Sequence, residues 1–277
     1  MGDSESVVYP AEIIDCLQGK RLALIGFDRG DTARLLEALA AFRVFTHSFA
    51  YHEVRLGSPA LRPFDLLVIH IPSRIEEFGS LTQESAAQNT KPLLFIGPFE
   101  LLLQEISATH FKLYDFLSFP WPPEEVVLRI YHVLSATPQP AKTSLVPTAS
   151  GKAQVLIADD DPIIVTTVKA ALVKYGMDCL IAQNGGVAVT LVRAHHPDAV
   201  ILDINMPFLD GFEVLHTIKK DPQTRGIPVL MLTSLKQEND VIRCFGLGAD
   251  DYVTKPFRPL ELAARVKRLL QRAATHK

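Results

Sequence analysis

The sequence predicts an α/β protein made of two doubly wound parallel-sheet domains. Short apolar runs of strand length alternate with longer segments whose apolar residues recur at helical spacing. This alternation occurs twice, and a stretch rich in Pro, Ser, Thr and Ala separates the two series. Such alternation is typical of parallel sheets with helices on both faces. We therefore predict an N-terminal extension over 1–19, a first domain over 20–134, a linker over 135–152 and a second domain over 153–277.

The composition argues against several classes of protein. The 277 residues are 48% hydrophobic and 21% charged, as in ordinary globular domains. The net charge of −3 gives no bulk attraction to nucleic acid or to an anionic membrane, and we expect neither as a partner. The polar N-terminus does not resemble a secretory signal, and the apolar runs are too short to cross a bilayer. Three widely spaced cysteines fit neither a disulfide framework nor a metal knuckle, so we expect a cytoplasmic protein.

The second domain opens with a strand-like segment over 154–159, QVLIAD. Asp161 can cap the helix that follows, and Pro162 suits the first position of that helix. The helix predicted over 163–175 has apolar residues at helical spacing, and Gly176 can end it. Strands and helices then alternate over 178–183, 185–196, 198–204, 211–220, 227–234, 238–248, 251–256 and 259–274.

The later elements carry boundary signals of their own. The helix predicted over 185–196 stops before Pro197, which cannot continue it. The run over 198–204 is apolar nearly throughout, as expected of a central parallel strand that is covered on both faces. An Asp-Gly pair then supplies turn chemistry before the next helix. The closing segment over 259–274 is an amphipathic helix.

Polar side chains follow the predicted strands of this domain where each strand ends. The carboxyl ends of parallel strands lie at one edge of a sheet, and doubly wound sheets bind ligands there. One edge is therefore expected to gather at least three carboxylates, a hydroxyl and an ammonium group. The residues concerned are Asp159, Asp160, Asp161, Asp203, Thr233, Ser234 and Lys255.

These groups suit phosphoryl chemistry. Carboxylates a few ångströms apart repel one another by several kcal/mol at intermediate dielectric. A hard divalent cation with oxygen ligands offsets this repulsion, and Mg²⁺ is the ion we expect. Asp203 would then stay ionised and could act as a nucleophile, because carboxylates form aspartyl-phosphates. Thr233, Lys255 and the metal could stabilise the transferring group from three directions.

Four separated motifs carry a family resemblance: VLIADDDP, DAVILDINMPFLDG, VLMLTS and GADDYVTKPF. In order and spacing they resemble the receiver domain of two-component response regulators, and the resemblance covers about Ala153 to Arg272. It implies a flavodoxin-like fold of five β–α units, related to the chemotaxis receiver CheY, with strand order 2-1-3-4-5.

The resemblance also implies a role for each matching residue at the metal. Asp159 and Asp160 would be the acidic pair that holds Mg²⁺. Asp203 would be the phosphoacceptor and a direct metal ligand. Asn205 would offer its backbone carbonyl to the metal. The third acid of the run, Asp161, is interpreted as a helix cap instead.

Three further residues would carry the switch. Thr233 would move toward the phosphoryl group, and Lys255 would pair with that group. Tyr252 would swing inward as Thr233 moves, although it could instead simply cover apolar surface. The face formed by the fourth helix, fifth strand and fifth helix would be the output surface, and a homodimer through this face is one route of output.

The first half of the chain repeats the pattern at an offset of about 133 to 136 residues. LALIGFD matches VLIADDD, FDLLVIHIP matches DAVILDINM, PLLFIGP matches PVLMLTS, and YDFLSFPWPPEEVVLRIYHVL matches DDYVTKPFRPLELAARVKRLL. We therefore predict a second receiver-like sheet. The edge at the carboxyl ends of its strands, called the rim below, differs from that of the second domain. Of the acids there, only the one at the helix-cap position is kept. The residues at the matching positions are Gly26, Phe27, Asp28, His70, Gly97 and Phe119.

Without carboxylates this rim has no site for a hard metal, so we interpret the first domain as a pseudo-receiver kept for contacts. His70 could in principle accept a phosphoryl group, but phosphotransfer histidines of this system lie on helices rather than at strand ends. Phe119 and Trp121 could form a surface patch or fill the vacated pocket, and the sequence leaves both open. The match is weaker over 50–63 and 73–90.

The leading hypothesis is a response regulator that accepts a phosphoryl group on Asp203 from a histidine kinase or phosphotransfer protein. It would signal to a downstream protein partner, without a DNA-binding output domain and without enzymatic activity beyond its own phosphorylation and dephosphorylation. One alternative is the regulatory part of a larger effector enzyme, such as a diguanylate cyclase. A haloacid-dehalogenase-type phosphatase is less well supported, because Asn205 stands where that class needs a second Asp.

Overall fold

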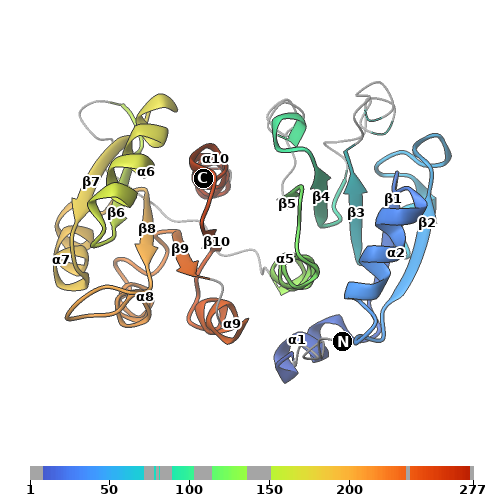
Figure 1. Cartoon of the computed structure of the whole chain (residues 1–277), viewed down its shortest axis with the longest axis horizontal. Helices are drawn as coiled ribbons and strands as arrows, with labels where there is room; N and C mark the ends of the chain where they lie inside the picture. The colour runs from blue at the N-terminus through green and yellow to red at the C-terminus, as the bar shows by residue number, and fades with distance from the viewer. Residues whose placement is uncertain are drawn as a thin grey trace, which may run out of the picture. The chain divides into compact units, whose positions relative to one another are not determined.

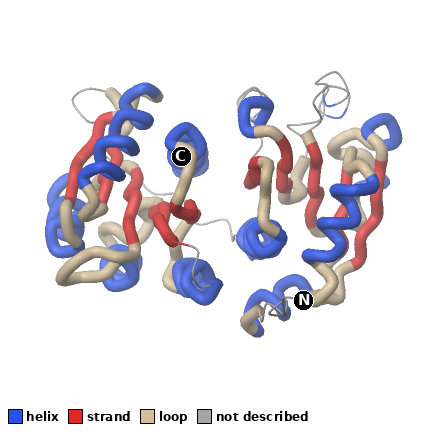
Figure 2. Tube along the Cα trace, viewed as in Figure 1, coloured by secondary structure: helices blue, strands red, loops and turns tan. Residues whose placement is uncertain are grey.

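The computed structural model consists of two units, residues 1–137 and 138–277, and each is an α/β unit with one parallel sheet (Figures 1 and 2). The structure describes residues 9–71, 78, 81, 89–102, 114–135, 151–234 and 238–274. The linker predicted over 135–152 falls largely on 136–150, which lie outside the described residues, as does most of 73–90. No helix of the described residues is both long and apolar enough to span a membrane.

The C-terminal unit has five parallel strands in the order β7-β6-β8-β9-β10, which is the predicted order 2-1-3-4-5. The prediction of fold class is therefore confirmed. The strands are β6 (Gln154–Ala158), β7 (Asp178–Ala182), β8 (Ala199–Asp203), β9 (Val229–Ser234) and β10 (Asp251–Lys255). Every residue of β8 is buried, as its unbroken apolar run predicts.

Helices cover this sheet on both faces (Figure 1). Helices α6 and α10 pack against each other on one face, and the neighbouring helices α7 and α8 pack together as a second pair. The apolar core between the sheet and the first pair includes Ile157, Val168, Leu230 and Leu262. The helices are α6 (Pro162–Lys174), α7 (Gly185–His195), α8 (Gly211–Lys220), α9 (Glu238–Gly246) and α10 (Pro259–Ala274).

Side-chain caps fix where the helices of this unit begin. The Asp161 carboxylate accepts a hydrogen bond from the Ile163 backbone N–H at 2.8 Å, which confirms its interpretation as the cap of α6. Asp210 accepts from the Glu213 N–H at 2.8 Å, and Glu213 accepts from the Asp210 N–H at 3.1 Å. This capping box starts α8 directly after the turn that follows β8.

The N-terminal unit also has five parallel strands, in the order β2-β1-β3-β4-β5. They are β1 (Arg21–Ile25), β2 (Phe45–Phe49), β3 (Leu66–His70), β4 (Leu93–Gly97) and β5 (Tyr114–Ser118). Two short 3₁₀ helices, Tyr51–Glu53 and Pro59–Leu61, lie between β2 and β3, in one of the regions where the match between the two halves is weaker.

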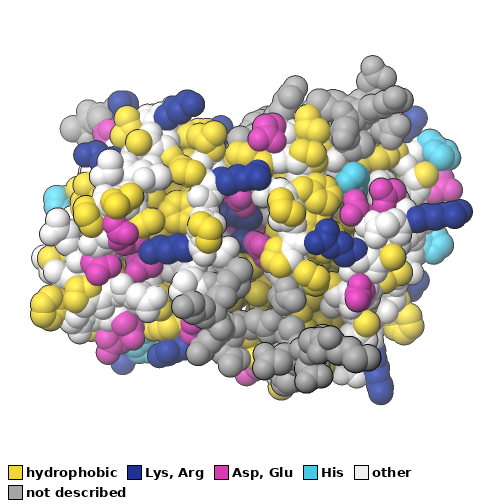
Figure 3. All heavy atoms as spheres, viewed as in Figure 1, with side chains coloured by type: hydrophobic (Ala, Val, Ile, Leu, Met, Phe, Trp, Pro, Cys, Tyr) yellow, Lys and Arg dark blue, Asp and Glu magenta, His cyan; other side chains and the backbone are white. Residues whose placement is uncertain are grey.

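Two helices of this unit, α2 (Arg29–Ala38) and α5 (Pro123–Ser135), pack together. The predicted N-terminal extension contains a helix of its own, α1 (Ala11–Leu17), which contacts α5 and buries Ile13 and Leu17. Acidic and basic side chains are interspersed with apolar ones on the face that Figure 3 shows, in agreement with the small net charge.

Candidate functional site

The polar residues predicted at the strand ends of the C-terminal unit come together. Asp203 ends β8, and Asp159 follows the last residue of the neighbouring strand β6. Asp203 pairs in register with Leu232, one residue before Thr233 on β9, and Lys255 ends β10 opposite Ser234. Because all these strands run parallel, their carboxyl ends place the side chains at one edge of the sheet.

Lys255 bridges the two buried acids. Its Nζ lies 2.6 Å from Asp203 Oδ1 and 2.9 Å from Asp159 Oδ2. Asp159 is fully buried and Asp203 is 4% exposed, so neither carboxylate can rely on water to stabilise its charge. Burial alone would lower the pKa of Lys255, but hydrogen bonds to Asp203 and Asp159 raise it above its ordinary value. The ammonium group therefore stays charged at neutral pH.

Asp203 responds to burial in the opposite direction. Desolvation raises its pKa above the ordinary value, although the Lys255 ammonium and the backbone N–H of Asn205 both oppose this. The Asn205 N–H donates to Asp203 Oδ2 at 3.1 Å. One lysine thus does not fully compensate the cost of ionising this carboxylate, and a further cation beside it would lower the pKa.

The donor set of the site fits such a cation. One oxygen from each of Asp159, Asp160 and Asp203 lies within 4.8 Å of the others. Three carboxylates and one ammonium leave two negative charges, which a divalent ion neutralises. The ligands are all oxygens, and Asp160 is exposed, so a small hard ion could keep part of its water shell. The residues present therefore fit Mg²⁺.

The two predicted switch residues lie on the neighbouring strands β9 and β10. Thr233 is buried on β9 and pairs in register with Thr254 on β10. Tyr252 lies on β10, and its ring contacts the ring of Phe245 on α9 edge-on, with centroids 5.6 Å apart. The role of both residues in a switch stays a prediction, as does the Asn205 carbonyl as a ligand.

Comparison with known proteins agrees with this geometry. Residues 155–267 match the response regulator receiver domain family. Residues 155–267 in the C-terminal half of this chain are therefore a receiver domain. The predictions of a response regulator receiver and of its fold are confirmed.

Several bacterial regulators are similar to the receiver domain. The DNA-binding dual master transcriptional regulator RpaA of Synechocystis is 44% identical over 119 residues, which are 43% of this chain and 49% of that protein. The alkaline phosphatase synthesis regulator PhoP of Bacillus subtilis is 40% identical over 120 residues, again 43% of this chain and 49% of that protein. The chain thus spans about half the length of the curated relatives it matches.

The solved structures that are similar to this chain match the same C-terminal half. A putative response regulator from Chloroflexus aurantiacus is 34% identical, with a TM-score of 0.42, over 43% of this chain and 98% of that one. The receiver domain of sensor histidine kinase PA1611 from Pseudomonas aeruginosa is 28% identical, with a TM-score of 0.41, over 43% of this chain and 98% of that one. That structure holds a magnesium ion coordinated in its active site cleft.

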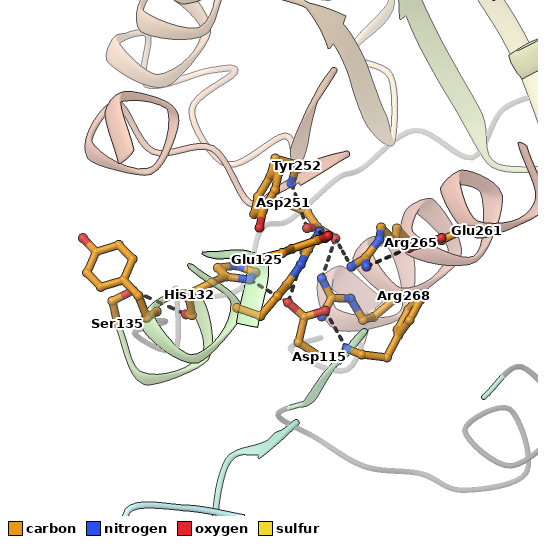
Figure 4. A network of polar contacts seen from close by, with 12 residues as sticks. Asp115, Glu125, His132, Ser135, Asp251, Tyr252, Glu261, Arg265 and Arg268 are labelled. Carbon is orange, nitrogen blue, oxygen red and sulfur yellow. Dashed lines mark hydrogen bonds and ion pairs between the residues drawn. The ribbon is translucent and has the colours of Figure 1, made fainter. Parts of the chain in front are cut away.

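The receiver domain also has a charged network that the sequence analysis did not single out (Figure 4). Arg268 donates to Asp251 Oδ2 at 2.6 Å, and Arg265 Nη1 lies 3.5 Å from the same oxygen. Arg265 also donates to Glu261 at 3.0 Å. These residues come from β10 and α10, the strand and helix of the predicted output face.

The N-terminal unit contains the same network within itself (Figure 4). Arg129 donates to Asp115 at 3.3 Å and to Glu125 at 3.4 Å, and His132 Nδ1 lies 3.0 Å from Asp115. These residues occupy the positions of the receiver network, as the matched segments YDFLSFPWPPEEVVLRIYHVL and DDYVTKPFRPLELAARVKRLL already indicate. The repeat therefore keeps the Asp, Glu and Arg of this network, with His132 at the position of Arg268, while it loses the acids of the rim.

Aromatic rings take the place of the acidic site in the N-terminal unit. The His70 ring contacts those of Phe27 and Phe119, with centroids 5.4 Å and 5.7 Å away. The hydroxyl of Tyr51 donates to the backbone carbonyl of His70. Burial lowers the pKa of His70 below its ordinary value, although Asp31 opposes this, so the imidazole is neutral at pH 7. No metal-ligating cluster lies at this rim among the described residues.

The alternatives for Phe119 and Trp121 are resolved by their contacts. Phe119 packs edge-on against His70 and so helps to fill the vacated pocket. Trp121 is buried, and the Arg34 guanidinium lies over its ring at 4.7 Å. Arg34 also donates to the Trp121 carbonyl at 3.1 Å, which holds the loop after β5 against α2.

The role of Tyr51 can be tested at Gly26. This glycine has φ +76°, and a Cβ there would overlap the Tyr51 ring. We expect Gly26→Ala to lower the free energy of unfolding by about 2–4 kcal/mol, because left-handed strain and overpacking add. The matched control Gly19→Ala has φ +75° with nothing within 4 Å of its Cβ, and should cost about 1–2 kcal/mol. Urea denaturation measures both, and equal losses would contradict a Tyr51-filled pocket.

Proposed function

We propose that this chain is a phosphorylation-dependent response regulator of the two-component type. It accepts a phosphoryl group on Asp203 from a histidine kinase or phosphotransfer protein. The observation that carries the proposal is the clustering of Asp159, Asp160 and Asp203 within 4.8 Å, with Lys255 bonded to two of them. Burying the carboxylates of Asp159 and Asp203 costs desolvation free energy, so we interpret the site as retained for chemistry rather than for stability.

The chemistry follows from the partners of Asp203. A carboxylate oxygen attacks phosphorus as the bond from the donor histidine nitrogen to phosphorus breaks, and the imidazole keeps that electron pair. The Lys255 ammonium, 2.6 Å from Asp203, lies where it can neutralise the oxygens of the transferred group. Mg²⁺ bound by Asp159, Asp160, Asp203 and the Asn205 carbonyl would neutralise further phosphoryl charge. Hydrolysis of the resulting acyl phosphate returns the carboxylate.

Output passes from the site along β9 and β10 in this proposal. Thr233 moves toward the phosphoryl group, and Tyr252, whose ring contacts Phe245, repacks against α9. The equilibrium between two conformations then shifts, and the face of α9, β10 and α10 changes its contacts with a downstream protein or a second copy. The chain's own catalysis is limited to gain and loss of this phosphoryl group.

DNA binding is not carried over from the relatives. RpaA is named as a DNA-binding regulator, but its similarity to this chain covers only 49% of its length. In such relatives the receiver is joined to further sequence. The second candidate is therefore that this chain is the regulatory part of a larger effector enzyme. A phosphatase of the haloacid dehalogenase type is disfavoured, because the Asn205 amide cannot donate and regain a proton as a general acid must.

The proposal is tested with a small phosphodonor. We expect the chain, incubated with Mg²⁺ and acetyl phosphate, to gain a single phosphate in intact-mass measurement, because Asp203 is the one proposed acceptor of the acidic cluster. A chain that stays unmodified would refute the proposed function. Steady turnover of p-nitrophenyl phosphate without a stoichiometric adduct would instead support the phosphatase.

A further inference from the structure

Phe208 has an unfavourable conformation and an unfavourable environment at once. Its φ is +70°, in the left-handed region that a bulky residue rarely adopts. The Leu209 N–H donates to the Pro207 carbonyl at 2.9 Å, so Phe208 is the apex of a tight three-residue turn. Its side chain is 95% exposed, the most of the large apolar side chains among the described residues.

The fold does not require a phenylalanine at this position. Glycine or asparagine takes a positive φ at lower cost, and an exposed ring contributes nothing to the core. Strained residues persist mainly where they serve a function. The loop around Phe208 is also well anchored, because the Gly211 N–H donates to the Ile204 carbonyl at 2.9 Å. The ring is thus presented to solvent by a loop that is closed at its base.

The place of Phe208 connects it with the phosphoacceptor. It lies five residues after Asp203, on the loop that leaves the carboxyl end of β8. Ile163, which is 73% exposed, lies five residues after the end of the neighbouring strand β6. Two exposed apolar side chains therefore follow the two adjacent strand ends that place Asp159 and Asp203: Phe208 on the loop after β8, and Ile163 in the first turn of α6.

The burial of Asp203 limits how a phosphodonor can approach this rim. Asp203 is 4% exposed, so a phosphoryl group has to be brought close to the carboxyl ends of β6 and β8 to reach its carboxylate. A phosphohistidine is part of a folded protein, and the surface around it must then meet the residues of the rim. Exposed apolar side chains at such a contact are the usual source of binding energy. A small phosphodonor makes no such contact.

We propose that Phe208 and Ile163 are the apolar docking contacts for the phosphohistidine-bearing protein that donates to Asp203. The inference rests on the proposed function and names the partner surface of the same site. It separates two classes of donor, because the rim contacts should matter for a protein donor and not for acetyl phosphate.

The test compares both donors on the full chain. The variants are Phe208→Ala, Phe208→Gly and Ile163→Ala, with Val173→Ala as a control, because Val173 is 55% exposed near the other end of α6. The protein donors are purified, autophosphorylated cores of sensor histidine kinases, taken from a panel and retained if they label wild type. We expect transfer from these cores to slow about tenfold in the Phe208 and Ile163 variants, and acetyl phosphate labelling to stay within about twofold. Val173→Ala should leave both rates unchanged.

Phe208→Gly adds a second readout. Since glycine accepts the positive φ, we expect its melting temperature to rise while its transfer from the kinase cores falls. Wild-type transfer rates in the Phe208 variants, or equal losses with both donors, would overturn the inference. Labelling of wild type by acetyl phosphate but by no core of the panel would overturn it as well. Failure of acetyl phosphate itself would count against the proposed function instead.

Discussion

Asp203→Asn is expected to abolish phosphorylation by acetyl phosphate. An amide is not a nucleophile toward phosphorus, and no other carboxylate of the site lies where Asp203 ends β8. The substitution keeps the size of the side chain and leaves the bond between Lys255 and Asp159 in place. Intact-mass measurement in the presence of Mg²⁺ should show one added phosphate in wild type and none in the variant.

Asp161→Asn is the matched control for this prediction. Asp161 belongs to the same acidic run, but its carboxylate caps α6, and asparagine is an equally good cap. We therefore expect this variant to be labelled like wild type. A phosphate retained by Asp203→Asn would place the acceptor elsewhere, and an adduct that is lost on His70→Asn would locate it in the N-terminal unit. Loss of labelling in Asp161→Asn as well would show that any change in the acidic run disturbs the site.

Removal of Mg²⁺ is expected to have an effect of similar size. Without a divalent ion, three carboxylates face one ammonium, and the pKa of Asp203 is raised by its burial. Phosphoryl oxygens would then meet uncompensated negative charge. We expect EDTA to prevent labelling by acetyl phosphate, and excess Mg²⁺ to restore it.

Asp160→Asn tests the ligand set directly. Asp160 is exposed, and no bond to Lys255 depends on it, so the fold of the site should survive the change. Loss of one ligand charge at contact distance should weaken Mg²⁺ binding about tenfold or more, as measured by calorimetry. Asp210→Asn is the control, because Asp210 caps α8 and asparagine replaces it there. Equal Mg²⁺ affinity in all three proteins would contradict the proposed metal site.

Much of the candidate site could be predicted because it depends on strand ends. Apolar runs indicate where β6, β8 and β9 lie, and parallel strands must bring their carboxyl ends to one edge. Asp159 and Asp203 follow from this rule alone. Asp161 could be assigned as a cap from its position before Pro162, because capping is a local interaction.

Other features could not be read from local patterns. Tyr51 lies in a segment without periodicity, so nothing in the sequence indicates that its ring covers Gly26 and its hydroxyl reaches His70. Phe208 looks like an ordinary turn residue until its φ and its exposed ring are known. The acids and arginines of β10 and α10 align between the two halves of the sequence, but nothing in the sequence indicates that they bond to one another.

The amino-acid sequence by itself therefore determined the two series of strands and helices, the helix caps and the acids at the strand ends. These follow from the period of apolar residues and from interactions between near neighbours along the chain. Only the tertiary structure decided that Lys255 contacts both Asp159, 96 residues away, and Asp203, and that aromatic rings fill the other rim. Contacts between distant segments depend on strand register and on the packing of helices against each sheet, and no local pattern encodes these distances.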